Sequence, residues 1–218
     1  MRMKEDAMGN GQLKPAFNLQ HGVDSEYITW LTIGYQPTDT TTLIPFLKDA
    51  GQHLKFKYKN ITADAGYESE ENYLFLEANN QIAFIKPANY EISKTRKYKN
   101  DIGKIENMEY DEISDSYTCK NNRKLTVSHL RHSKSKTGYV SEKTIYICED
   151  CRECPYKSSC IKGNNCKTPL EERTKVLQVA KTFIKHRKED LERIISDEGV
   201  LYRMNRSCLL YTSPSPRD

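Results

Sequence analysis

The sequence predicts an α/β fold in which strands and helices alternate along the first 87 residues and a small antiparallel, cysteine-rich insert follows. Three observations lead to this prediction. Hydrophobic periodicity switches between the two-residue repeat of strands and the helical repeat, in the order β-β-α-β-α-β. After Pro87 the composition changes to lysine, tyrosine, asparagine and serine. Five of the seven cysteines then lie between residues 148 and 166.

The first predicted elements are two strands and a helix. Residues Leu13–Asp24 read as an extended segment, and Tyr27–Gly34 is rich in β-branched and aromatic residues, which favour strands. Asp39 is a candidate N-cap, because apolar residues recur at helical spacing after it until Gly51. We therefore expect a pair of strands and then a helix that ends at Gly51.

A strand, a helix and another strand are predicted next. Asn60–Asp64 reads as a short strand whose last residue is an acid. Ser69 can cap the following helix, which has glutamates in its first turn, where the helix dipole favours negative charge. This helix ends at Asn79-Asn80, and Gln81–Lys86 predicts a further buried strand.

The rest of the chain predicts a sheet, a helical region and a tail. Turn signals at Asn121-Asn122 and Thr137-Gly138 indicate an antiparallel sheet. A long helical region is expected from Leu170, with Gly199 as its C-cap. Residues 208–218 differ abruptly in composition from the rest of the sequence, and we interpret them as a foreign peptide. The alternative is a natural disordered tail.

Composition limits the class of protein. A hydrophobic content of 37% supports a folded core, and no stretch approaches the roughly 20 apolar residues of a membrane helix. The start lacks an apolar run, so we expect no signal peptide and a cytoplasmic location. In a reducing compartment, cysteines serve more naturally as metal ligands or free thiols than as disulfides. A net charge of +4 permits a polyanionic partner without requiring one.

The cysteine run is a candidate metal site. Cys148, Cys151 and Cys154 are spaced by two residues each, and Cys160 and Cys166 follow. Four thiolates suffice for structural zinc, which would stabilise an insert too small to build its own core. An iron–sulfur cluster and unliganded thiols are the alternatives.

Positive charge is concentrated in the insert. Two histidines, His129 and His132, and two aromatic residues, Tyr117 and Tyr139, are interleaved with the charges. Such a hairpin could bind a DNA backbone, or it could be a solvated lysine-rich loop. The candidate DNA-binding residues of the insert are Lys120, Arg123, Lys124, Arg131, Lys134 and Lys136.

Asp64 is the candidate catalytic residue, because it stands at the end of a predicted strand and before a turn of small residues. The alternative is an aspartate that caps a turn or helix. The segment Thr62-Ala-Asp-Ala-Gly-Tyr-Glu-Ser-Glu-Glu-Asn72 resembles the second-aspartate motif of bacterial insertion-sequence transposases of the DDE type. Met8–Asn18 resembles the block that precedes this motif, with Phe17 where a tyrosine is usual, and Pro37–Asp39 and Leu43–Phe46 are similar to the connecting region.

This resemblance implies a fold, an activity and partners. The family fold is RNase-H-like, a mixed sheet with helices, and two aspartates and a glutamate in it hold two Mg²⁺ ions that cut and rejoin DNA. Asp64 would be the second acid. The implied partner is double-stranded DNA, both transposon ends and target, and a homodimer is expected because two ends must be brought together. The implied domains are a partial catalytic core (1–87), the insert ending in the cysteine cluster (88–168), a helical return to the core (169–207) and the tail.

The other two acids of the family are not found at matching positions. The first aspartate is expected on a strand before Met1. The glutamate is expected soon after Tyr202–Ser207, which resembles the start of the family's terminal helix signature. Arg203 and Arg206 in that segment are candidate phosphate contacts. A chain truncated in this way is expected to be inactive. The alternative functions are a non-catalytic, zinc-stabilised nucleic-acid-binding module and a metal-dependent hydrolase on an unrelated α/β fold.

Overall fold

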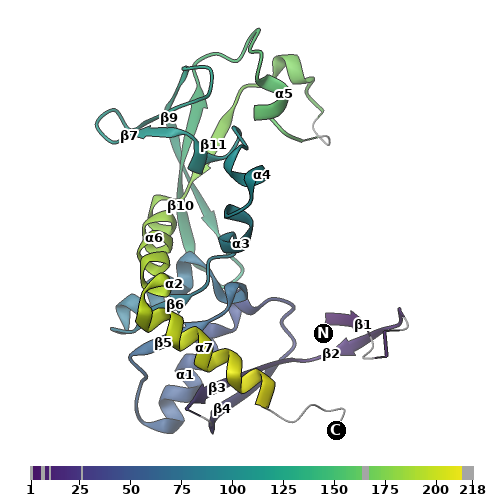
Figure 1. Cartoon of the computed structure of the whole chain (residues 1–218), viewed down its shortest axis with the longest axis vertical. Helices are drawn as coiled ribbons and strands as arrows, with labels where there is room; N and C mark the ends of the chain where they lie inside the picture. Colours follow the sequence, from purple (N-terminus) through teal and green to yellow (C-terminus); the bar gives the residue numbers. More distant parts are fainter. Residues whose placement is uncertain (1, 6–7, 10, 26, 164–166, 213–218) are drawn as a thin grey trace. The chain divides into compact units, whose positions relative to one another are not determined.

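The computed structural model is a mixed α/β protein, as the sequence predicts, and it describes residues 2–5, 8–9, 11–25, 27–163 and 167–212 (Figure 1). The chain forms two compact units. We call Met1–Ala88 together with Lys185–Asp218 the N/C unit, and Asn89–Ile184 the sheet unit. No helix among the described residues is both long and apolar enough to cross a membrane.

The strands of the N/C unit form three pairs. β1 (Arg2–Glu5) pairs antiparallel with β2 (Leu13–Ala16), and β3 (Asn18–Asp24) pairs antiparallel with β4 (Tyr27–Gly34). β5 (Asn60–Ala63) pairs parallel with β6 (Ile82–Ile85). The predicted order β-β-α-β-α-β is confirmed by β3, β4, α1, β5, α2 and β6.

The first helix differs from its prediction at both ends. Asp39 is not its N-cap: a 3₁₀ turn, η1 (Asp39–Thr41), precedes α1 (Leu43–Leu54), and Thr42 occupies the cap position. The helix also continues past Gly51. Lys55 terminates it with a left-handed φ of 63°, so this lysine adopts the conformation that we expected of the glycine.

The second helix follows its prediction. α2 (Glu70–Ala78) begins after Ser69, whose Oγ accepts the backbone N–H of Asn72, and Asn79 is its C-cap. Its buried residues Tyr73 and Leu76 lie in the core of the unit with the apolar residues of β6. A 3₁₀ turn, η2 (Ala65–Tyr67), joins β5 to this helix.

A buried carboxylate attaches α6 (Lys181–Ile195) to β6. Asp190 is fully buried and accepts the backbone N–H of Ile85 at 3.1 Å and the hydroxyl of Tyr73 at 3.1 Å. Burial raises the pKa of Asp190 to about 6. Beside it, the buried carboxylate of Glu68 is held by Arg187 through two contacts of 2.6 and 2.8 Å. Buried polar groups are costly when they are unpaired, so these hydrogen bonds fix the helix to the strand.

Gly199 is not a C-cap, contrary to our prediction. α6 ends at Ile195, and Gly199 lies in the first turn of α7 (Asp197–Thr212). A Cβ at Gly199 would stand 2.1 Å from the backbone oxygen of Arg193, so only glycine allows the start of α7 to approach the end of α6 so closely.

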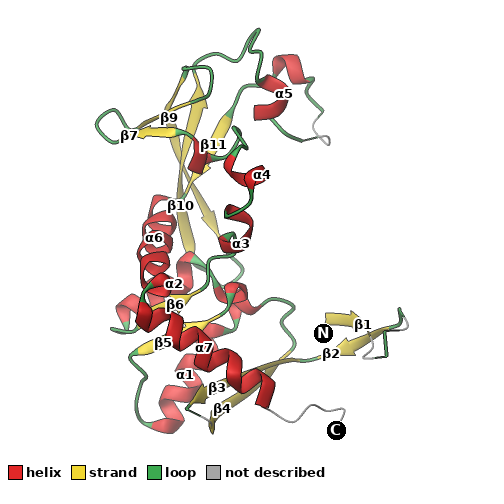
Figure 2. Cartoon of the chain, in the orientation of Figure 1, coloured by secondary structure: helices red, strands yellow, loops and turns green. Residues whose placement is uncertain are grey.

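The sheet unit is built on five antiparallel strands in the order β11-β10-β9-β8-β7 (Figure 2). The predicted turns are confirmed: Asn122 and Gly138 have φ values of 52° and 93° in the two connections that flank β9. Short helices lie in the segments that precede and connect these strands. The bounds are β7 (Glu109–Asp111), β8 (Ser116–Thr118), β9 (Lys124–Lys134), β10 (Val140–Cys148), β11 (Val176–Val179), α3 (Tyr90–Ser93), α4 (Arg96–Lys99), η3 (Ile105–Asn107), α5 (Lys157–Cys160) and η4 (Leu170–Glu172).

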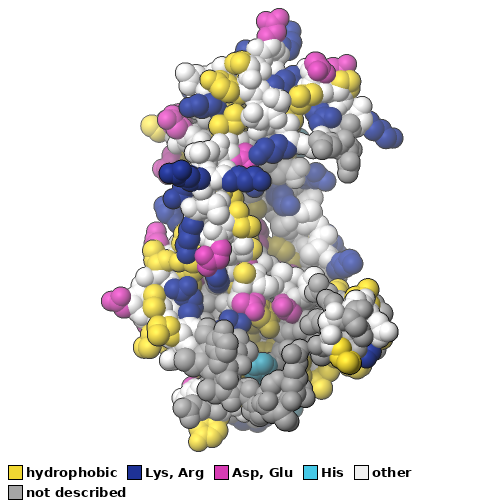
Figure 3. Space-filling model, turned by 45° about the vertical axis from the view of Figure 1, so that its right-hand side comes forward, with side chains coloured by type: hydrophobic (Ala, Val, Ile, Leu, Met, Phe, Trp, Pro, Cys, Tyr) yellow, Lys and Arg dark blue, Asp and Glu magenta, His cyan; other side chains and the backbone are white. Residues whose placement is uncertain are grey.

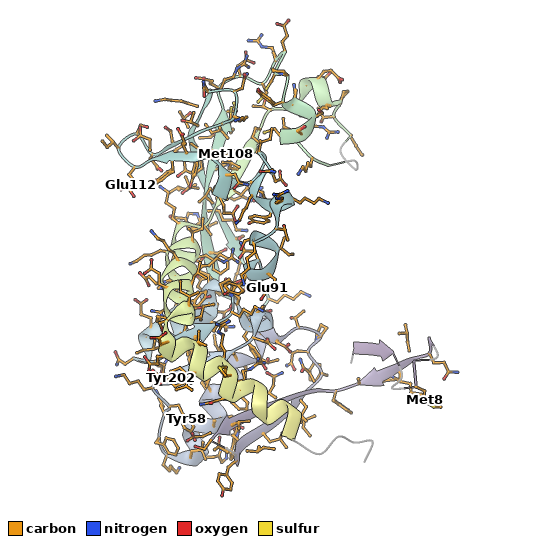
Figure 4. All side chains as sticks on the ribbon, viewed as in Figure 1. Met8, Tyr58, Glu91, Met108, Glu112 and Tyr202 are labelled. Atoms are coloured by element: carbon orange, nitrogen blue, oxygen red, sulfur yellow. The ribbon has the colours of Figure 1, made fainter. Side chains whose placement is uncertain are left out.

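The predicted helical region from Leu170 is wrong in its first part, because β11 lies there. Val176–Val179 alternates between exposed and buried side chains and pairs with β10, and the helix begins only at Lys181. The core beneath this sheet contains Leu125, Tyr146 and Leu177, and Met108, labelled in Figure 4, packs with them. An edge strand that completes this core is more stable than a helix of the same four residues.

Candidate active site and cysteine cavity

Asp64 stands directly after β5, at the end of the strand. Its Oδ1 accepts the backbone N–H of Gly66 at 2.9 Å, so the carboxylate caps η2. The side chain is 47% exposed, and its second oxygen is not turned into the core. The strand end and the cap together orient one oxygen and leave the other accessible.

Arg206 of α7 contacts the accessible oxygen. Its Nη2 lies 3.0 Å from Asp64 Oδ2, although the two residues are 142 positions apart. Tyr202, one helical turn earlier, positions α7: its hydroxyl accepts from the side-chain amide of Asn60 at 2.7 Å, and its ring meets Phe84 edge-on at 5.0 Å (Figure 4). The second candidate on this helix, Arg203, is half-buried.

Asp39 is a second carboxylate beside Asp64, and our sequence analysis missed it as a site residue. A Cβ built on Gly66 would lie 3.0 Å from Asp39 Oδ2 and 3.1 Å from Asp64 Oδ1, so these oxygens are at most about 6 Å apart, the sum of the two distances. Asn18 and Gln20 donate to Asp39 Oδ1 at 2.6 and 3.4 Å. The similarity of Pro37–Asp39 to the transposase connecting region was the available signal.

Tyr67 faces both carboxylates. Its hydroxyl donates to Gln20 Oε1, a short contact. Burial, followed by the negative charges of Asp39 and Asp64, raises the pKa of Tyr67 to about 12. The phenol is therefore neutral at physiological pH and can donate a hydrogen bond. Among the described residues, no group of three or more His, Cys, Asp and Glu side chains is arranged to hold a metal ion.

The cysteine run forms a cavity in the sheet unit. Five cysteines line it, and its volume is about 20 Å³. None of them is in a disulfide. Four were predicted as ligands, and the fifth, Cys119, lies after β8, far from the run in sequence. Cys166 lies outside the described residues. The cavity is lined by Cys119, Arg123, Cys148, Asp150, Cys151, Cys154, Lys157, Cys160, Ile161 and Lys175.

Burial disfavours the thiolate form of two of these cysteines, Cys148 and Cys160. Burial raises the pKa of Cys148 to about 12, and the neighbouring Cys151 and Cys119 add to the effect. Burial also raises the pKa of Cys160, with the same two neighbours among the contributors. Cys119 and Cys160 pack against the buried core that contains Cys148 and Cys151.

Comparison with known proteins finds one similar family. Residues 118–209 match the family model described as transposase DDE domain. This match, over about two fifths of the chain, supports a fragment of a DDE-type transposase. No curated protein and no solved structure matches it. The matched segment contains the cysteine run, β9, β10, α6 and nearly all of α7, including Arg203 and Arg206, and Asp64 lies outside it.

The predicted basic residues of the insert have different surroundings and do not form one group. The guanidinium of Arg123 donates to the backbone oxygens of Asp150 and Arg152 at 2.7 and 3.3 Å, so it supports the cysteine loop. Lys120 lies in the turn before β9, Lys136 in the turn after it, and Lys124, Arg131 and Lys134 lie on the strand. Figure 3 shows Lys and Arg side chains scattered over the visible face of the sheet unit.

Two like charges face each other on the long hairpin of β9 and β10. Arg131 of β9 lies directly opposite Lys143 of β10 in the antiparallel register. Like charges placed opposite each other destabilise a sheet, unless an anion lies between them. Lys143 was not among the predicted DNA-binding residues. By contrast, His132 lies opposite Glu142, and its Nε2 is 3.1 Å from the carboxylate.

Proposed function

We propose that this chain contributes to a two-metal nuclease site that cuts and rejoins DNA during transposition, with Asp64 as a metal-binding acid. One observation carries the proposal. The contact between Arg206 and Asp64 brings the segment that matches the transposase family against a strand-end carboxylate outside that segment. An isolated capping aspartate would need no such partner.

The strand pairs support an RNase-H-like core. β3 and β4 form one sheet and β5 and β6 another, and each of these strands has a single partner among the described residues. A further strand between β3 and β5 would join the two pairs into a five-stranded mixed sheet. It would run past Asp64 and could bring another acid to the same edge. In this proposal, residues 88–168 are an insert into the core.

The residues around Asp64 suit phosphoryl transfer. Two bound Mg²⁺ ions, roughly 4 Å apart, would activate the attacking oxygen and stabilise the leaving oxygen. Asp64 and Asp39 offer the hard carboxylate oxygens that Mg²⁺ prefers. The guanidinium of Arg206 can pair with a phosphate oxygen through planar hydrogen bonds.

We propose that the hairpin of β9 and β10 contacts the DNA backbone. A phosphate placed between Arg131 and Lys143 would replace their mutual repulsion by attraction. Because transposition joins two element ends, we propose that the protein acts as a homodimer on double-stranded DNA.

Iron-directed cleavage of the protein tests the metal site. Fe²⁺ replaces Mg²⁺ in the purified chain, and ascorbate with peroxide then generates radicals that cut the backbone near the bound ion. We expect cuts near Asp64 and Asp39 that excess Mg²⁺ suppresses and that Asp64→Asn removes. Asp24→Asn, a matched change at the exposed end of β3, should leave the cuts unchanged. An unaltered pattern in Asp64→Asn would refute the proposal.

The cysteine cavity favours a second candidate, a zinc-stabilised nucleic-acid-binding module without catalysis. In that case Asp64 only caps η2. DNA binding by the chain together with no Mg²⁺-sensitive cleavage near Asp64 would support this alternative over the first.

A further inference from the structure

We propose that the cavity in the sheet unit is a zinc site in which Cys119 joins Cys148, Cys151 and Cys160 as a ligand. The site is separate from the one proposed around Asp64 and does not depend on it. Its four sulfurs come from the turn after β8, the end of β10, the loop that follows β10, and the end of α5.

The size of the cavity fits one ion. A space of about 20 Å³ accommodates one particle the size of a water molecule. A cavity lined by five thiols offers water few good partners, whereas soft thiolates are preferred ligands of Zn²⁺. Four cysteines complete the tetrahedral shell of a structural zinc ion.

Packing against the core selects four of the five cysteines. Cys148 and Cys151 belong to the buried core of the sheet unit, and Cys119 and Cys160 pack against that core. Cys154 lines the same cavity but is not among the residues that pack against this core. We assign Cys154 as the spare thiol, although its spacing in the sequence is that of a ligand.

The surroundings compensate the charge of such a site. Four thiolates with one Zn²⁺ carry a net charge of −2. The cavity is lined by three cations, Arg123, Lys157 and Lys175, and by one acid, Asp150, which pairs with Arg123 at 3.3 Å. The backbone N–H of Lys175 donates to Cys151 Sγ at 3.3 Å, the kind of outer hydrogen bond that orients a metal ligand. These cations and this donor would stabilise thiolates and have no comparable effect on neutral thiols.

Small movements would complete the site. The described side chains do not now converge to hold a metal. A jump between staggered rotamers moves a cysteine sulfur by about 3 Å, enough to redirect it within the cavity. Binding then converts four thiols and one Zn²⁺ into a tetrathiolate complex and releases four protons. The ion would tie the turn after β8 to the cysteine loop and α5.

Cobalt titration of the full chain tests the ligand set. The metal-free, reduced protein is titrated with Co²⁺, whose tetrahedral thiolate complexes absorb strongly in the visible range, and Zn²⁺ is then added to displace it. We expect one Co²⁺ per chain with a tetrathiolate spectrum and release of about four protons. Absence of this spectrum would overturn the proposal.

Variants separate a ligand from a merely structural cysteine. Cys119→Ser should weaken Zn²⁺ binding at least tenfold, and Cys119→His should restore binding with a shifted cobalt spectrum, because histidine is also a zinc ligand. Cys154→Ser and the control Cys208→Ser, in the N/C unit, should bind as the parent does. A parental spectrum in Cys119→Ser, or its loss in Cys154→Ser, would refute the assignment. A Cys119→His variant that folds and binds no Co²⁺ would do the same.

Discussion

Replacing Asp190 by asparagine should change how the stability of the N/C unit depends on pH. The carboxyl group of Asp190 is fully buried, and its pKa is raised from 3.8 to about 6, mainly by that burial. Asparagine has nearly the same shape and stays neutral. Its side-chain oxygen can accept the N–H of Ile85, and its amide can donate to Tyr73.

The magnitude follows from the two pKa values. The folded state binds the proton more tightly than the unfolded state, so stability from this group is fully present below about pH 4 and is lost as pH rises through about 6. The difference between 3.8 and about 6 corresponds to roughly 3 kcal/mol. Asp190→Asn avoids this loss. The measured quantity is the free energy of unfolding of Asp190→Asn minus that of the parent. This difference should be up to about 3 kcal/mol larger at pH 7.5 than at pH 4.

Urea unfolding at the two pH values measures this effect. The single tryptophan, Trp30, belongs to the same unit, where its indole donates to Asp49 at 2.8 Å, so its fluorescence reports the unfolding. Asp24→Asn serves as the control, because Asp24 is exposed. If the difference between Asp190→Asn and the parent is equal at pH 4 and pH 7.5, Asp190 does not carry the raised pKa and the argument fails.

Three further changes test other contacts. Gly66→Ala would press a methyl group against two carboxylate oxygens at 3.0 and 3.1 Å and should cost about 1 kcal/mol in urea unfolding; an unchanged midpoint would show that the carboxylates move apart freely. Gly199→Ala should lower the free energy of unfolding by about 2 kcal/mol or more, because its methyl group would clash with the backbone of α6 as in an overpacked core. Helix propensity alone predicts a gain of about 1 kcal/mol, so a more stable variant would refute the close approach of the two helices. Arg131→Ala with Lys143→Ala should weaken duplex DNA binding and reduce the salt slope by about 2; an unchanged slope would exclude phosphate contacts there.

Local patterns in the sequence predicted local structure well. Ser69 caps α2 because an N-cap depends on a few neighbouring residues. Asp64 likewise follows β5 directly and caps η2, as its place before a turn of small residues indicated. The prediction of Gly199 as a C-cap was wrong. A glycine after a helical run can mark either a C-cap or a close approach of two helices, and the sequence pattern is the same in both cases.

Long-range proximity could not be predicted in the same way. Asp39 approaches Asp64 because η1 and η2 lie together, and no local pattern records that contact. Cys119 stands 29 residues before Cys148 without a paired cysteine, so spacing rules pass over it. β11 shows the two-residue alternation of a strand, but the longer helical pattern that follows it dominated our prediction.

The two interpretations of Asp64, a cap and a metal-binding acid, do not exclude each other. Its Oδ1 is fixed by the N–H of Gly66, and its Oδ2 pairs with Arg206 at 3.0 Å with both side chains partly exposed. An exposed ion pair of this kind contributes at most about 1 kcal/mol, so a divalent cation could displace the arginine at small cost. The capping bond would meanwhile keep the carboxylate oriented, and preorganised ligands of this sort lose little entropy when a metal binds. A cap at the end of β5 is thus a suitable way to hold a catalytic carboxylate in place.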